Sequence, residues 1–276
     1  MAKYEIVIDN VAVFCGEHDE RAVLPISYTV EGKTLEADNL DRTLLREAHN
    51  NGLKVRSQIT PKDSTLVLEK LLEEGNDLLI LSVTSGLSES FSTANYIAKG
   101  LRIKHPSRKI VVLDTLSCGS GEGLLYSLAK AWQKEGLELD QVAQNLNEAI
   151  KRLHHVFITD DAIMLANAGI IPTTALNIKP IFDIASNGHV CVLQKTMGKK
   201  KALGDIVKYV ASTLDKEFCP QAVISYGNEP DARALGENVS KLLPDAKLSY
   251  ANENVFVSAY LGDNSVSICF FGEARK

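Results

Sequence analysis

The sequence lacks several features that would assign it to a familiar functional class. Its five cysteines are odd in number and show no CxxC spacing, so neither a disulfide framework nor a zinc site is indicated. It contains neither a P-loop nor a GxGxxG fingerprint. Its formal net charge is -5 and no basic face stands out, which disfavours a nucleic acid as its partner.

Long apolar runs are also missing. The N-terminus enters a strand-like alternation at once, without the apolar core of a signal peptide. No run of about 18 apolar residues follows, so we expect no transmembrane segment. Charged residues make up 24% of the chain and hydrophobic residues 45%, which is typical of a soluble globular protein. We therefore expect a cytoplasmic protein.

The hydrophobic pattern predicts an α/β protein, and its 276 residues suit two domains. The first part of the chain alternates strands and helices, as in a parallel sheet covered on both faces. Beyond His154 strands prevail, which predicts a second, α+β domain. We place the domains at residues 1–154 and 155–276, with a fixed cleft between them as a site for a small ligand. The predicted strands are 4–8, 78–83, 110–113, 156–159, 190–195, 221–226, 247–251 and 266–271; the predicted helices are 64–74, 123–135, 139–153, 161–167, 200–214 and 229–243.

Between residues 80 and 94 a short apolar run is followed by a cluster of hydroxyl groups. The apolar residues suit a buried parallel strand, and Ser85, Ser88 and Ser90 fall where a helix would begin. The free backbone N–H groups of a helix start favour an anion. Two interpretations stay open here, because the serines either form a binding site or only cap the helix.

Other residues are candidates for catalysis or metal binding. Cys118 lies in a turn of small residues, where a thiol is either a nucleophile or a packed side chain, and we favour packing. Asp9 and Asp114 follow predicted strands and could hold Mg²⁺, although such aspartates are more often turn formers. The neighbouring His154 and His155 would point to opposite faces of a strand, so we predict no metal site.

Several sequence blocks, in the same order, resemble the DegV family of fatty-acid-binding proteins, which serve bacterial fatty acid kinase. Residues 57–61 (SQITP) resemble its TSQPSP-type segment, and residues 84–91 (TSGLSESF) resemble its SSxLSGTY segment. Residues 165–169 and 177–181 (NIKPI) are similar to its LxxGGRI block and the segment after it, and Gly262 falls in a segment that reads close to HTGPG in relatives. The resemblance spans nearly the whole chain. It implies a two-domain fold with an N-terminal parallel sheet and a mostly antiparallel C-terminal sheet.

The resemblance also implies a function. Such a protein holds one long-chain fatty acid in an apolar tunnel and presents the carboxylate to a partner kinase subunit, which phosphorylates it. It needs no catalytic residue and no cofactor, and it allows transient contact with a membrane. Thr60 and Ser88 match the family's hydroxyl donors to the carboxylate, and Ser85 and Ser90 would be additional donors. Burial of the tail contributes about 0.8 kcal/mol per CH₂.

The chain departs from the family at the carboxylate end. Ile170 stands where the family has the arginine of GGRI, and Tyr260 where it has the histidine of HTGPG. Asp263 replaces the proline of that segment, so an acidic group would repel an approaching carboxylate. These changes leave three alternatives open. The protein could bind another small amphiphile or neutral lipid with Ile170 and Tyr260 in the wall, act as an interaction protein without lipid, or be an enzyme that uses Asp9, Asp114 or Cys118.

Overall fold

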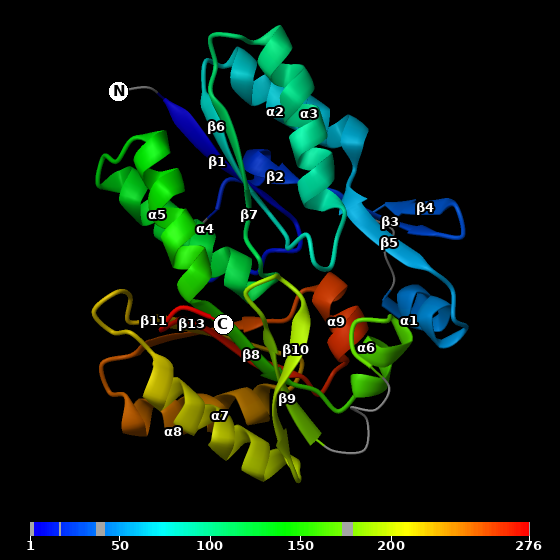
Figure 1. Ribbon diagram of the computed structural model, residues 1–276, viewed down its shortest axis with the longest axis vertical. Helices are drawn as coiled ribbons and strands as arrows, with labels where there is room; N and C mark the ends of the chain where they lie inside the picture. The colour runs from blue at the N-terminus through cyan, green and yellow to red at the C-terminus, as the bar shows by residue number, and fades with distance from the viewer. Residues whose placement is uncertain (1–2, 17, 37–41, 173–178, 276) are drawn as a thin grey trace.

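The computed structural model describes residues 3–16, 18–36, 42–172 and 179–275. These residues form a four-stranded sheet, a six-stranded sheet and a small three-stranded sheet (Figure 1). The two larger sheets lie at opposite ends of the view, with helices on their faces, and the small sheet lies at one side. The structure confirms the predicted α/β class and the change from a parallel to a mostly antiparallel sheet.

The four-stranded sheet is parallel, with the strand order β2-β1-β6-β7. Its side chains alternate between two cores, because successive residues of a strand point to opposite faces. Ile6 and Leu79 pack against α4 and α5, whereas Val7 and Ile80 pack against α2 and α3. The bounds are β1 (Tyr4–Asp9), β2 (Val23–Leu24), β6 (Asp77–Ser82), β7 (Ile110–Asp114), α2 (Pro61–Glu73), α3 (Ser90–Lys104), α4 (Ser120–Lys134) and α5 (Leu139–Arg152).

The six-stranded sheet has the order β10-β9-β8-β13-β11-β12, and only its β11–β12 pair is parallel. Helices α7 and α8 cover one face, where Ile224 and Phe270 are fully buried. The other face turns Cys269 and Phe271 toward α4, and Phe157 and Phe182 toward α6 and α9. The bounds are β8 (Leu153–Ile158), β9 (Lys179–Ile184), β10 (Val190–Thr196), β11 (Gln221–Tyr226), β12 (Lys247–Asn252), β13 (Val266–Phe271), α6 (Ala162–Asn167), α7 (Lys199–Thr213), α8 (Glu229–Leu242) and α9 (Val255–Leu261).

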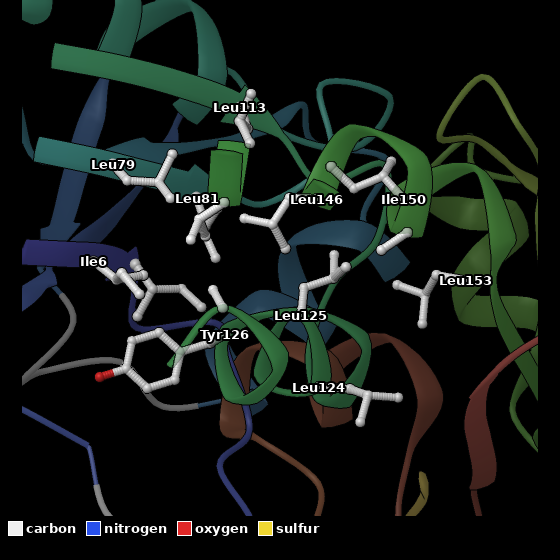
Figure 2. Packing of buried hydrophobic residues seen from close by; sticks show 14 of the residues in the cluster. Ile6, Leu79, Leu81, Leu113, Leu124, Leu125, Tyr126, Leu146, Ile150 and Leu153 are labelled. Atoms are coloured by element: carbon white, nitrogen blue, oxygen red, sulfur yellow. The ribbon is translucent and has the colours of Figure 1, made fainter. Parts of the chain in front are cut away.

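Helix α4 joins the two larger sheets. Every residue from Ser120 to Tyr126 is buried, so the helix has no solvent face over its first two turns. Figure 2 shows Leu124, Leu125 and Tyr126 of α4 near the leucines of β6 and α5. A Cβ atom on Gly123 would lie 1.8 Å from the carbonyl oxygen of Val13, so only glycine permits this approach of helix and loop.

The sequence did not predict the small sheet, nor the helices α1 and α9. The sheet is antiparallel, with the order β4-β3-β5, and helix α1 leads into β5. Helices α1, α6 and α9 pack against one another beside it (Figure 1). The bounds are β3 (Ile26–Val30), β4 (Lys33–Glu36), β5 (Val55–Ile59), α1 (Arg42–Asn50) and a 3₁₀ turn, η1 (Glu20–Ala22).

The division of the chain at residues 154 and 155 stays a prediction. Strand β8 of the six-stranded sheet begins at Leu153, directly after α5. In the part of the chain that the structure describes, no helix combines the length and apolar character needed to cross a membrane.

The close approach at Gly123 predicts a stability effect. Gly123→Ala should lower the free energy of unfolding by about 1–3 kcal/mol or more, because the new methyl group overlaps a backbone oxygen that cannot move freely. Gly204→Ala is the matched control, since Gly204 is exposed on α7 with nothing within 4 Å of an added Cβ. That change should be neutral or stabilising by up to about 1 kcal/mol. Urea unfolding measures both, and equal values would contradict the packing described for α4.

Candidate functional site

An apolar cavity lies at the carboxyl ends of the parallel strands, between them and the strands β8 to β10. Together with the part that is open to solvent, the empty space between its lining atoms is about 870 Å³. Helices α1, α6 and α9 and the small sheet close its side. The lining residues are Val11, Tyr28, His49, Val55, Ser57, Val83, Leu87, Ser88, Cys118, His155, Phe157, Leu165, Ala168, Ile170, Ile184, Val190, Phe256, Val257, Tyr260 and Leu261.

A shallow surface depression adjoins the cavity between β5 and the loop before α3. Val55, Ser57, Leu87 and Ser88 line both the cavity and this depression, and we infer that the cavity opens here and call this side its mouth. The depression is also bordered by two exposed cationic side chains and two further residues of the loop. These are Lys54, Arg56, Ser85 and Glu89.

Ser88 is held in a local hydrogen-bond network. Its hydroxyl donates to the carbonyl oxygen of Ser57 at 2.9 Å and accepts from the backbone N–H of Ser90 at 3.2 Å. The Ser90 hydroxyl is 2.9 Å away and fully buried. Because Ser88 has one O–H and already donates it, the hydroxyl would have to exchange partners before donating to a ligand.

The other predicted donors lie around the cavity but not in its wall. Thr60 is at the N-cap position of α2, makes no side-chain capping bond, and donates its backbone N–H to Pro25 at 2.7 Å. Ser85 lies in the depression at the mouth, where its N–H donates to the carboxylate of Asp114 at 3.2 Å. The structure therefore brings Ser88 to the cavity and Ser85 to its entrance, while Ser90 is buried behind Ser88.

Ile170 and Tyr260, which replace charged or titratable residues of the family pattern, both line the cavity. Burial raises the pKa of Tyr260 to about 12, so its hydroxyl keeps its proton at neutral pH. Asp263 and Asn264 lie elsewhere, in a polar depression that also holds the ion pair of Arg46 with Asp161.

Two histidines line the cavity without having been predicted as site residues. His49, on α1, is 5% exposed, and its ring centroid lies 5.1 Å from that of Tyr260. His155, on β8, is 1% exposed. Burial lowers the pKa of His49 and brings that of His155 to about 4, so both imidazoles are neutral at pH 7. A lone histidine on a short helix gives no local signal of a site, which is why the sequence did not reveal His49.

The structure also describes the surroundings of the three candidates for catalysis, Cys118, Asp9 and Asp114. Burial, together with the nearby carboxyl groups of Glu122 and Glu253, raises the pKa of Cys118 well above its usual value, which disfavours a thiolate. Asp9 accepts the N–H groups of Val83 at 2.8 Å and Val11 at 3.2 Å, and thus ties two loops together.

Asp114 is likewise engaged with the backbone. It accepts from the N–H of Leu116 at 3.1 Å as well as from Ser85. Both aspartates therefore form turns, the role favoured from the sequence. Across the described ranges, no three His, Cys, Asp or Glu side chains are grouped as a metal site would require.

The sequence of the chain matches a known protein family. The model of a family described as "Uncharacterised protein, DegV family" matches residues 6–273. The chain belongs to the DegV family. It is 29% identical to the DegV domain-containing protein YteA of Lactococcus lactis, over 99% of this chain and 98% of that protein. Of the NIKPI segment noted in the sequence, Asn177 and Ile178 lie outside the described residues.

Solved DegV structures share the fold. The Streptococcus pneumoniae fatty acid kinase B3 protein, loaded with linoleic acid, has a TM-score of 0.82 at 18% identity, covering 98% of this chain and all of that one. A DegV family protein from Eubacterium eligens, loaded with heptadecanoic acid, has a TM-score of 0.81 at 15% identity, with the same coverage. At these identities the likeness establishes the fold, and the ligands are those of the two bacterial proteins.

The buried carboxyl groups predict how stability varies with pH. Burial raises the pKa of Asp9 from 3.8 and that of Glu253 from 4.5, each to about 7 in the folded protein. Between about pH 4 and 7 these two groups bind more protons in the folded state than in the unfolded state, so their contribution to stability falls as the pH rises, whereas the lowered pKa of His155 contributes a change of opposite sign. Asp9→Asn should flatten the fall, because about 1.4 kcal/mol per unit of pKa difference disappears with the titrating group.

The change also has a cost that does not depend on pH, since an amide oxygen cannot accept both N–H groups as the two carboxyl oxygens do. Urea unfolding from pH 4 to 8 separates the slope from this offset. Asp140→Asn, at an exposed carboxylate on α5, should leave the slope in place. An unchanged slope in Asp9→Asn would contradict the burial described for Asp9.

Proposed function

We propose that this chain binds one long-chain fatty acid, with the tail in the cavity and the carboxylate at its mouth, and presents that carboxylate to a partner kinase. The observation that carries the proposal is the predominantly apolar wall of the cavity, which opens at a depression bordered by Lys54 and Arg56. A tail of 16 carbons would gain about 12 kcal/mol from burial before the costs of binding are subtracted.

The charge distribution supports this orientation of the ligand. Arg56 pairs with Glu89 at 3.3 Å, and Lys54 is exposed beside it, so the mouth carries cationic groups in solvent. The interior groups His49, His155 and Tyr260 are neutral at pH 7. A carboxylate is therefore better accommodated at the mouth than inside, where its desolvation would have no cation to offset it.

In this proposal the protein carries the fatty acid and catalyses no reaction itself. The protonated thiol of Cys118 and the turn-forming roles of Asp9 and Asp114 support this view. The kinase subunit would approach the surface around the mouth. The cytoplasmic location expected from the sequence stays a prediction.

A second candidate ligand is a neutral amphiphile, such as a long-chain alcohol. It is favoured by Ile170, because an uncharged wall does not require a charged head group. Comparing palmitate with 1-hexadecanol, which differ only at the head group, separates the two ligands.

Mass spectrometry tests whether the cavity holds a lipid. Native spectra of the purified protein should show one additional mass that matches a fatty acid in a solvent extract of the same sample, because burial of the acyl tail against an apolar wall favours retention. Protein without bound lipid should take up added palmitate in a 1:1 ratio. An unliganded mass that does not change with either palmitate or 1-hexadecanol would disprove the carrier function.

Restoring the cation tests why the carboxylate stays at the mouth. Ile170→Arg should tighten palmitate binding about tenfold while leaving 1-hexadecanol little changed, because a cation inside the cavity would offset the desolvation that otherwise keeps the carboxylate at the mouth. Ile163→Arg is the matched control, since Ile163 is 46% exposed on α6 and does not line the cavity. Competition against a fluorescent fatty acid measures the affinities. Equal effects on both ligands would place the carboxylate out of reach of residue 170.

A further inference from the structure

Two residues of the cavity wall carry hydrogen-bonding atoms that an ordinary acyl tail cannot satisfy. The Nε2 atoms of His49 and His155 are enclosed by protein atoms, and neither has a hydrogen-bond partner among the residues that the structure describes. Both residues line the cavity, and neither lines the depression at its mouth. A buried polar atom without a partner costs about 1–3 kcal/mol, and a saturated tail would leave both atoms in that state.

We infer that the preferred ligand is an oxygenated fatty acid, whose tail carries a hydroxyl group that hydrogen-bonds to Nε2 of His49. This inference rests on the proposed function and narrows it from fatty acids in general to those with a polar group along the chain. The carboxylate stays at the mouth between Ser57 and Ser88, and the second polar group lies within the cavity beside α1 and α9.

The chemistry of the imidazole selects a hydroxyl group. A neutral imidazole presents either an N–H donor or a lone pair at Nε2, according to its tautomer. A hydroxyl both donates and accepts, so it pairs with either tautomer, whereas a second carboxylate would bring an uncompensated charge into the cavity. The ring of Tyr260 lies 5.1 Å from that of His49. Tyr260 therefore adds a side chain with a protonated hydroxyl to the same part of the wall.

His49 has fewer polar neighbours than His155 and is therefore the better candidate for the hydrogen bond to the ligand. The His155 ring already has a neighbour at Nδ1, the Ser117 hydroxyl at 3.4 Å, and it lies close to the buried Asp183, whose carboxylate accepts the His155 backbone N–H. Among the described residues, the ring of His49 has an aromatic contact with Tyr260 and no hydrogen-bond partner at Nε2. Its Nε2 is therefore the polar atom most dependent on a ligand.

The test compares stearate with 10-hydroxystearate and 12-hydroxystearate. The native chain should bind at least one hydroxystearate about tenfold more tightly than stearate, because the hydroxyl satisfies an atom that stearate leaves unpaired. His49→Leu should abolish this preference, so that the variant binds the three acids with similar affinity, since a leucine side chain extends the apolar wall and offers no hydrogen bond. Competition against a fluorescent fatty acid gives the affinities, and thermal unfolding confirms that the variant is folded.

His105→Leu is the matched control. Its Nε2 is also buried without a hydrogen-bond partner, but His105 follows α3 and does not line the cavity, so its loss should leave the preference intact. If the native chain binds stearate as tightly as both hydroxystearates, the inference is overturned and the carrier function stands, as would happen if a bound water satisfied Nε2. A preference that disappears in His155→Leu and persists in His49→Leu overturns the assignment to His49. If none of the three acids binds, both proposals fail.

Discussion

The structure depends on the burial of helix α4 between its two larger sheets. A helix whose first two turns are covered on all sides must approach its neighbours closely there, and Gly123 permits contact with the carbonyl of Val13 that any side chain would block. A second close approach occurs where a Cβ on Gly86 would lie 2.4 Å from the carbonyl oxygen of Gly188, and the Thr84 hydroxyl donates to that oxygen at 3.0 Å. The first contact packs α4 against the loop after β1, and the second joins the loop after β6 to the turn between β9 and β10. The cavity lies between the sheets that α4 and the loop after β6 connect.

The same burial determines the chemistry of the interior. In a region with little water the charged form of every titratable group is disfavoured, so carboxyl groups, thiols and tyrosines gain protons while histidines lose them. Asp9, Cys118, Tyr260 and His155 all shift in this direction. A wall of neutral groups cannot select a ligand by charge. It selects by shape and by whether each buried donor or acceptor finds a partner.

Much of the fold could be predicted from the sequence because its main strands are short apolar runs with clear ends. Residues 221–226 and 266–271 form β11 and β13 within the predicted bounds. Helix α9 was missed although Asn254 caps its first turn and Gly262 ends it with a φ of 72°, since seven residues carry too weak a periodicity. Ser88 could be predicted as a cavity residue from a local sequence pattern. Ile170 and Tyr260 could be predicted only from the resemblance to the family. His49 lies in the cavity because α1 packs against α9, a tertiary contact that no local pattern records.

Ile170 stands where the family has an arginine, and this replacement changes which interactions can recognise the ligand. With a buried cation, one strong charge-assisted pair would dominate recognition, and the rest of the wall would need only to be apolar. Without it, a carboxylate keeps its favourable free energy only near solvent and the cationic side chains of Lys54 and Arg56 at the mouth. In the proposed complex, further discrimination would come from neutral hydrogen bonds inside the cavity, because an imidazole that a plain tail leaves unsatisfied can pair with the hydroxyl of an oxygenated tail. The mouth would then bind the carboxylate, and the interior would distinguish between tails.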